Sequence, residues 1–219
     1  MTRSSSMAPS TQLGDTNAGS LSRLANVVLD PIVGFRGIDR HPTGSVAFLA
    51  LVALRFGSLL TFYRPDTSPP RLLAGILFQF AMLIPVVTIT TTLLWIVAVV
   101  WRSRMPWATA WCITTHVMFA YTLLTVAFAS VAGALLPEST DVDLRHPPFT
   151  NIGGLVSASE SPILHALAIE ADVRSAYAAI LAWIGVRAAA NVSGVAAAAV
   201  ISTCVGVEVL AALLSALLR

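Results

Sequence analysis

The sequence contains no lysine, and only 11% of its 219 residues are charged, whereas about 25% is typical of a soluble domain. All 13 basic residues are arginine, and the formal net charge of +2 is too small to indicate nucleic-acid binding. No P-loop, GxSxG, HExxH, zinc-ligand or Rossmann pattern is present, so we expect neither an enzyme nor a metal or cofactor site. The two cysteines, Cys112 and Cys204, have no disulfide or metal-ligand spacing, and we interpret them as packing residues.

Apolar residues, by contrast, make up 56% of the chain, and the mean hydropathy is +0.80. So much apolar surface predicts an all-α polytopic transmembrane bundle, because a water-soluble domain exposes far more charge. Five segments are apolar and long enough to cross a hydrocarbon layer of about 30 Å: residues 45–63, 72–101, 107–136, 174–190 and 195–217. The segment 174–190 is the shortest and is rich in alanine, so a four-span arrangement remains an alternative.

The chain divides into three regions. Residues 1–20 are rich in Ser, Thr and Gly and lack the apolar core of a signal peptide, so we expect them to be disordered. Residues 21–44 begin as an amphipathic helix, with Ser20 as its N-cap, which we expect to lie in the membrane interface. Asp30-Pro31 should end or kink that helix. Residues 45–219 form the five-span domain.

The connection 137–173 is the longest and holds most of the acidic residues outside the N-terminal region. Ser161 followed by Pro162 predicts the start of a short helix within it. More arginines lie on the side of the N-terminus than on the other side, which favours the N-terminal side as cytoplasmic. The sequence therefore predicts a multi-pass protein of the bacterial inner membrane, with a cytoplasmic N-terminus and an external C-terminus.

Three stretches follow one another in a distinctive order: an entry segment at 29–48, a basic turn at 102–111, and a region at 149–193 that enters the fourth span. In this order and spacing the chain resembles the Yip1 family of small five-span membrane proteins, in its bacterial form, from about Leu24 onward. Arg174 departs from the family pattern, which usually has an aromatic residue there. The positions that match the pattern are Pro31, Phe35, Asp172, Tyr177 and Gly185.

The resemblance implies a membrane scaffold or adaptor, since the family has no catalytic motif to carry over. Its eukaryotic members bind small GTPases in vesicle traffic. We do not transfer that role, because this chain lacks a long acidic, aromatic-rich N-terminal tail.

Three polar residues fall inside predicted spans: Arg55 in the first, Gln79 in the second and Glu208 in the fifth. Counted at 1.5 Å per residue, all three lie roughly 10–14 Å from the outer ends of their segments. A charge within the bilayer usually faces the bundle interior and pairs. We therefore predict an Arg55–Glu208 ion pair with Gln79 as a third member, either as a structural layer or as a conduit for ions, protons or solute. Independent snorkelling of Arg55 is the other possibility.

His116 lies inside the third apolar segment. A histidine there could ligate a haem or a pigment, or relay protons. A hydrogen bond to a neighbouring helix explains it equally well, and we favour that interpretation.

Taken together, these patterns favour an integral membrane scaffold or accessory protein that contacts membrane lipids and other membrane proteins, as a homo- or hetero-oligomer or a subunit of a larger complex. The rival hypothesis is a small permease that conducts through the layer of Arg55, Gln79 and Glu208.

Overall fold

The apolar segments of the sequence fold into helices. The computed structural model describes residues 19–36, 38, 42–61, 69–135, 150–151, 161–190 and 192–217, and within them the fold is all-α, with no named strand. The helices are α1 (Ser20–Leu29), α2 (Pro31–Gly34), α3 (Gly44–Thr61), α4 (Pro69–Val100), α5 (Trp107–Leu135), α6 (Pro162–Glu170), α7 (Val173–Ala190) and α8 (Gly194–Leu217).

The predicted break at Asp30-Pro31 is confirmed. α1 ends at Leu29, and Asp30 begins α2 by accepting a hydrogen bond from the N–H of Val33 through Oδ1 at 3.3 Å. The predicted N-cap of α1 is wrong: Ser20 is the first helical residue and Gly19 takes the cap position. The break lets α2 fold back so closely on α1 that a Cβ at Gly34 would lie 2.5 Å from the backbone nitrogen of Val27.

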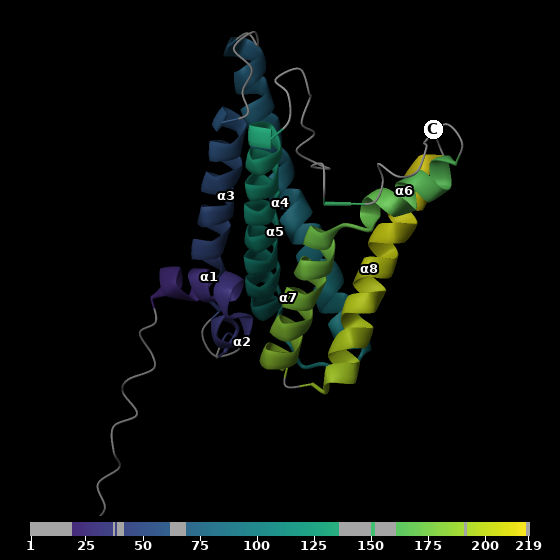
Figure 1. Ribbon diagram of the computed structural model, residues 1–219. Helices are drawn as coiled ribbons and strands as arrows, with labels where there is room; N and C mark the ends of the chain where they lie inside the picture. Colours follow the sequence, from purple (N-terminus) through teal and green to yellow (C-terminus); the bar gives the residue numbers. More distant parts are fainter. Residues whose placement is uncertain are drawn as a thin grey trace, which may run out of the picture.

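α5 is the central helix (Figure 1). It packs against α3 on one side, α7 on the other, and α4 and α1. α8 lies beyond α7 and contacts α4, and α6 crosses the C-terminal half of α8. The main core joins α1, α2, α4, α5, α7 and α8, and a smaller cluster of Leu51, Leu83 and Val87 joins α3 to α4.

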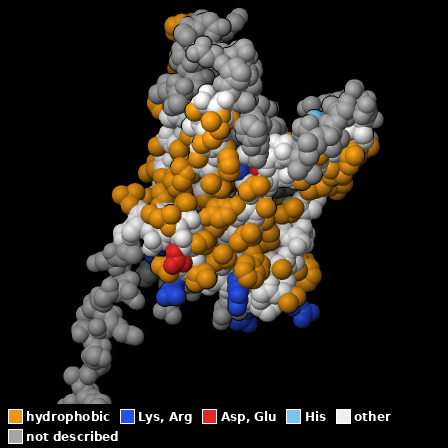
Figure 2. Space-filling view, in the orientation of Figure 1, with side chains coloured by type: hydrophobic (Ala, Val, Ile, Leu, Met, Phe, Trp, Pro, Cys, Tyr) orange, Lys and Arg blue, Asp and Glu red, His pale blue; other side chains and the backbone are white. Residues whose placement is uncertain are grey.

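The outer surface of this fold is strongly apolar. Figure 2 shows hydrophobic side chains over most of the visible side of the helices, whereas arginines gather at the end where α1 and α2 lie. Two helical stretches, Leu73–Val100 and Trp107–Leu135, are long and apolar enough to cross a membrane, judged by length and composition. In the most apolar window of each, only 28% and 22% of the residues, respectively, are buried inside the protein.

Candidate functional site

Two of the arginines in the helices have informative surroundings, Arg174 at the start of α7 and Arg55 in α3. The residue that organises the surroundings of Arg174 is Asp172, which takes the N-cap position of α7. Its Oδ1 accepts the backbone N–H of Arg174 at 2.6 Å, as an N-cap carboxylate does at a positive helix end. Thr150 donates to Oδ2 of Asp172 at 3.1 Å, and its carbonyl accepts the N–H of Val173 at 2.9 Å. Asp172 therefore joins α7 to a distant stretch of the chain, where Asn151 lies antiparallel beside it.

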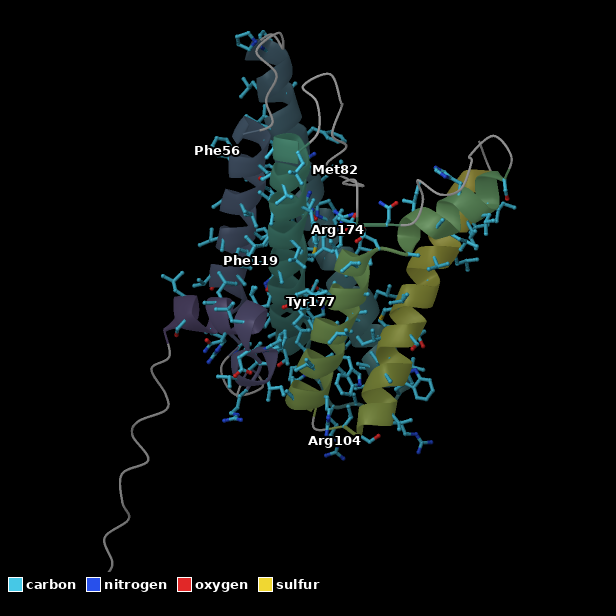
Figure 3. The ribbon with its side chains drawn as sticks, viewed as in Figure 1. Phe56, Met82, Arg104, Phe119, Arg174 and Tyr177 are labelled. Atoms are coloured by element: carbon cyan, nitrogen blue, oxygen red, sulfur yellow. The ribbon has the colours of Figure 1, made fainter. Side chains whose placement is uncertain are left out.

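Arg174 is only 1% exposed and is the largest fully buried side chain among the described residues. Its Nε lies 3.0 Å and 2.9 Å from the two carboxylate oxygens of Asp172, and its Nη2 also donates to Oδ2. On the opposite side Nη1 donates to Oγ1 of Thr125 on α5 at 2.9 Å, and the guanidinium carbon lies 5.1 Å from the ring centroid of Tyr121. Figure 3 places Arg174 at this junction of α5 with α7. The side chain thus makes a carboxylate, a hydroxyl and an aromatic contact at once.

The electrostatics of Asp172 reflect this enclosure. Burial alone would raise the pKa of its carboxyl group, because burial penalises the charged form. The hydrogen bonds and the positive charge of Arg174, together with the hydrogen bond from Thr150, outweigh burial and hold the pKa of Asp172 below its ordinary value. We interpret the cluster as a structural joint that holds the start of α7 against α5.

Sequence reasoning missed this joint. It singled out Asp172 only as a family-pattern position and treated Arg174 as a departure from that pattern. One signal was available, since Asp-x-Arg at the start of an apolar helix places a cap and a cation two residues apart. The other partners, Thr125 and Thr150, are remote in sequence, and no spacing rule points to them.

The second arginine, Arg55, has different surroundings. It lines a shallow pocket between α3 and α4 together with Gln79, so these two predicted residues do come together. The other lining residues are apolar: Phe56, Leu59, Phe80 and Leu83. Gln79 is exposed and Arg55 is half-buried, so this pocket opens sideways from the helices.

The guanidinium of Arg55 lacks a counter-ion in the part of the chain that the structure describes. Its Nε is buried and has no hydrogen-bond partner. The phenol of Tyr121, on α5, interacts with it electrostatically, but a neutral phenol does not balance a full charge.

Glu208, the third predicted member, lies in α8, and its side chain is outside the described residues. α3 and α8 stand on opposite sides of the molecule, with α5 and α7 between them (Figure 1). The predicted meeting of the first, second and fifth segments is therefore corrected: α4 contacts both α3 and α8, but those two do not pack together. Equal depth along two helices does not make them neighbours.

His116 is buried in α5 and bonds within its own helix. Its Nδ1 lies 2.8 Å from the carbonyl oxygen of Cys112 and 3.6 Å from the Cys112 sulfur. The predicted hydrogen bond to a neighbouring helix is wrong for this nitrogen, because Cys112 lies in the same helix. The sequence prediction did not consider Cys112, which lies four residues before His116. The ring of Phe35 meets the His116 imidazole edge-on, with centroids 6.3 Å apart. Within the described ranges no group of three or more His, Cys, Asp or Glu could hold a metal ion.

The remaining family-pattern positions share one structural task, which is to fasten α1 and α2 to the bundle. Pro31 begins α2, and Phe35 at its end is fully buried. A Cβ at Gly185 of α7 would lie 3.2 Å from the Phe35 ring and 2.9 Å from Cγ2 of Ile113, so glycine permits this close approach. The hydroxyl of Tyr177 donates to the carbonyl of Val28 at 2.8 Å.

Comparison with known proteins finds no matching family, no matching curated protein and no matching solved structure. The resemblance to the Yip1 family therefore rests on the sequence positions alone.

Proposed function

We propose that this chain is a five-span integral membrane protein that acts as a non-enzymatic scaffold or accessory subunit, of the Yip1-like type, in a larger membrane complex. The spans would be α3, α4, α5, α7 and α8. The observation that carries the proposal is the apolar outer surface of the helices.

A soluble protein with two long apolar helices would bury them in its core. Here fewer than a third of the residues in either window are buried, and α4 exposes Leu77, Ile84 and Ile89, each by more than half. Contiguous apolar surface on this scale is unfavourable in water and favourable in lipid. α8 adds exposed apolar side chains at Val195 and Leu210.

The distribution of charge supports an orientation. Five arginines lie at one end of the bundle, in α1, just after α2, in the turn between α4 and α5, and in the last turn of α7: Arg23, Arg36, Arg102, Arg104 and Arg187. Arginine enrichment of this kind marks the cytoplasmic side of an inner-membrane protein. The N-terminus would then be cytoplasmic and the C-terminal end of α8 external.

At the same end α1 and α2 are suited to the membrane interface. Leu24 and Val27 of α1 are buried against the bundle, whereas Leu29 and Ile32 are 82% and 64% exposed. Such a segment can lay its outer apolar residues among lipid headgroups, as an interfacial helix does.

A scaffold is favoured over the rival permease by the placement of the polar groups. A conduit needs Arg55, Gln79 and Glu208 to converge inside the bundle. The pocket with Arg55 and Gln79 opens sideways, and α8 lies on the far side of the molecule. A sideways-facing pocket that holds an arginine and a glutamine among apolar side chains suits contact with another membrane component.

Alkaline carbonate extraction of cell membranes and cysteine labelling test the proposal. With Cys112 and Cys204 replaced by Ala, Ser161→Cys should react with an impermeant maleimide in intact spheroplasts, and Arg104→Cys should react only after permeabilisation. Release of the protein by carbonate, or the same labelling of both sites, would exclude the five-span arrangement.

The scaffold role is tested separately. Purification in a mild detergent should yield a partner protein in stoichiometric amount, and the protein alone in liposomes should not pass protons or small ions. A proton flux that the Arg55→Leu change abolishes would favour the permease instead.

A further inference from the structure

The pocket between α3 and α4 combines a cation with an apolar opening. Arg55 and Gln79 supply the polar groups, and the rings of Phe56 and Phe80 lie with their centroids 6.5 Å apart beside them. Phe56 and Gln79 are exposed, so the pocket is accessible from the side of the bundle.

We propose that this pocket, here called the α3–α4 groove, docks a transmembrane helix of a partner protein that carries an Asp or Glu near the bilayer centre, where its carboxylate pairs with Arg55. The inference rests on the proposed function and names the chemistry of the partner that a membrane scaffold would bind.

The depth of Arg55 selects a helix rather than a lipid headgroup. Arg55 is eleven residues after Gly44, where α3 begins. At about 1.5 Å per residue it lies about 16 Å along the helix, near the middle of a hydrocarbon layer of about 30 Å. Lipid phosphates lie at the two faces of that layer. A carboxylate on a helix that crosses the bilayer is present at the required depth.

Among the residues that the structure describes, no carboxylate balances the charge of Arg55. Among the described carboxylates, Asp172 is bound to Arg174, and Asp30 caps α2 at the other end of the bundle. The buried Nε of Arg55 has no acceptor in the part of the chain that the structure describes. Intramembrane charges are costly unless they pair, which is why one without a partner marks a binding position.

The side chains that line the groove also suit an apolar helix with one carboxylate. Leu59 and Leu83 provide apolar walls, and the amide of Gln79 can donate to the second oxygen of a carboxylate. A guanidinium and an amide on adjacent helices would then hold one carboxylate from two sides.

The test uses the full-length protein in phosphatidylcholine liposomes and a labelled 23-residue Leu/Ala transmembrane peptide with one central Glu. Energy transfer between protein and peptide reports association. We expect the Glu peptide to bind at least tenfold more tightly than peptides with Gln or Lys at the same position. Arg55→Leu should abolish that preference, and Arg55→Glu should reverse it in favour of the Lys peptide.

Arg104→Leu is the matched control, since it removes an exposed arginine at the other end of the bundle and should leave the preference unchanged. Helix content of each variant is measured by circular dichroism, and Arg55→Lys should keep the preference for Glu if charge is what matters. Retention of the preference in a folded Arg55→Leu variant would overturn the proposal.

Two other occupants would also overturn it. One is a dimer of the protein alone that both Arg55→Leu and Glu208→Gln dissolve. The other is a retained anionic lipid that Arg55→Leu releases and the Glu peptide does not displace. Only protein that resists carbonate extraction is used in the titration. If that protein does not bind the Glu peptide, the docking site is excluded but the scaffold proposal is not. If the protein does not insert into membranes, both proposals are excluded.

Discussion

Arg174 and Arg55 are the same kind of residue in opposite circumstances. Both interact with Tyr121 of α5. Arg174 is enclosed by Asp172, Thr125 and the Tyr121 ring, whereas the buried Nε of Arg55 has no hydrogen-bond partner in the described part of the chain. The first arginine fastens α7 to α5, and the second presents its charge to a groove at the side of α3 and α4.

The difference shows how the surroundings of an arginine decide its role. A buried ion pair is costly to assemble and still more costly to break, because removal of one partner strands the other. Removal of a charge that has no counter-ion leaves no other charged group without its partner. Replacement by leucine should therefore destabilise the protein at Arg174 and not at Arg55.

The largest expected effect is that of Arg174→Leu. It leaves the buried carboxylate of Asp172 without its cation, and we expect a loss of about 3–5 kcal/mol in the free energy of unfolding. Thermal unfolding in detergent, followed by a thiol-reactive dye that reports exposure of buried Cys112, measures it. Arg104→Leu should change stability by less than about 0.5 kcal/mol. If both variants melt together with the wild type, Arg174 is not a structural joint.

Acid should weaken the same joint. The pKa of Asp172 is lower in the folded protein than its ordinary value of about 3.9, so its contribution to stability is present above that value and is lost as the pH falls through the lower folded pKa. The unfolding temperature should be flat from about pH 5 to 8 and fall below about pH 4. In Asp172→Asn the unfolding temperature should fall less steeply as the pH drops below about 4. An unchanged fall would show that other carboxyl groups cause the acid sensitivity.

A smaller effect is expected at the far end of the joint. Thr125→Val keeps the side-chain shape and removes the hydroxyl that accepts from Nη1 of Arg174, which should cost about 2 kcal/mol. Thr203→Val is the matched control, because the Thr203 hydroxyl is exposed and donates back to the carbonyl of Ala199 in its own helix. Equal losses at Thr125 and Thr203 would mean that the contact with α5 adds nothing.

The smallest change is expected at Arg55. Arg55→Leu removes a charge that no described carboxylate compensates, so the isolated protein should be unchanged or more stable by up to about 1 kcal/mol in the dye assay. A loss comparable to that of Arg174→Leu would show that Arg55 is paired within its own chain. The comparison of the two arginines would then fail.

Much of the fold could be predicted from the sequence. Each of the five apolar segments coincides with a helix to within a few residues, and Asp30-Pro31 and Ser161-Pro162 mark helix boundaries as predicted. These features are local: a run of apolar residues, a cap or a proline acts within one or two turns. The Cys112–His116 contact was equally local and could have been found from its i, i+4 spacing.

The candidate site was less accessible from the sequence. Depth along a span can be counted, and it placed Arg55 and Gln79 at one level, which their shared pocket reflects. The same count also suggested α8 as a neighbour of α3, because a residue count contains no information about the order of helices around a bundle. The partner of Arg174 on α5, Thr125, is 49 residues away in sequence.

The sequence by itself determined which residues become helices, where those helices begin and end, and which end of the bundle collects arginine. Local propensity and hydropathy are enough for that. Only the tertiary structure decided that α5 lies at the centre, that α3 and α8 are apart, that Arg174 is enclosed and that Arg55 is not. The physical reason is that helix neighbours are selected by side-chain packing over whole faces, as where Gly185 lets α7 approach Phe35 and Ile113.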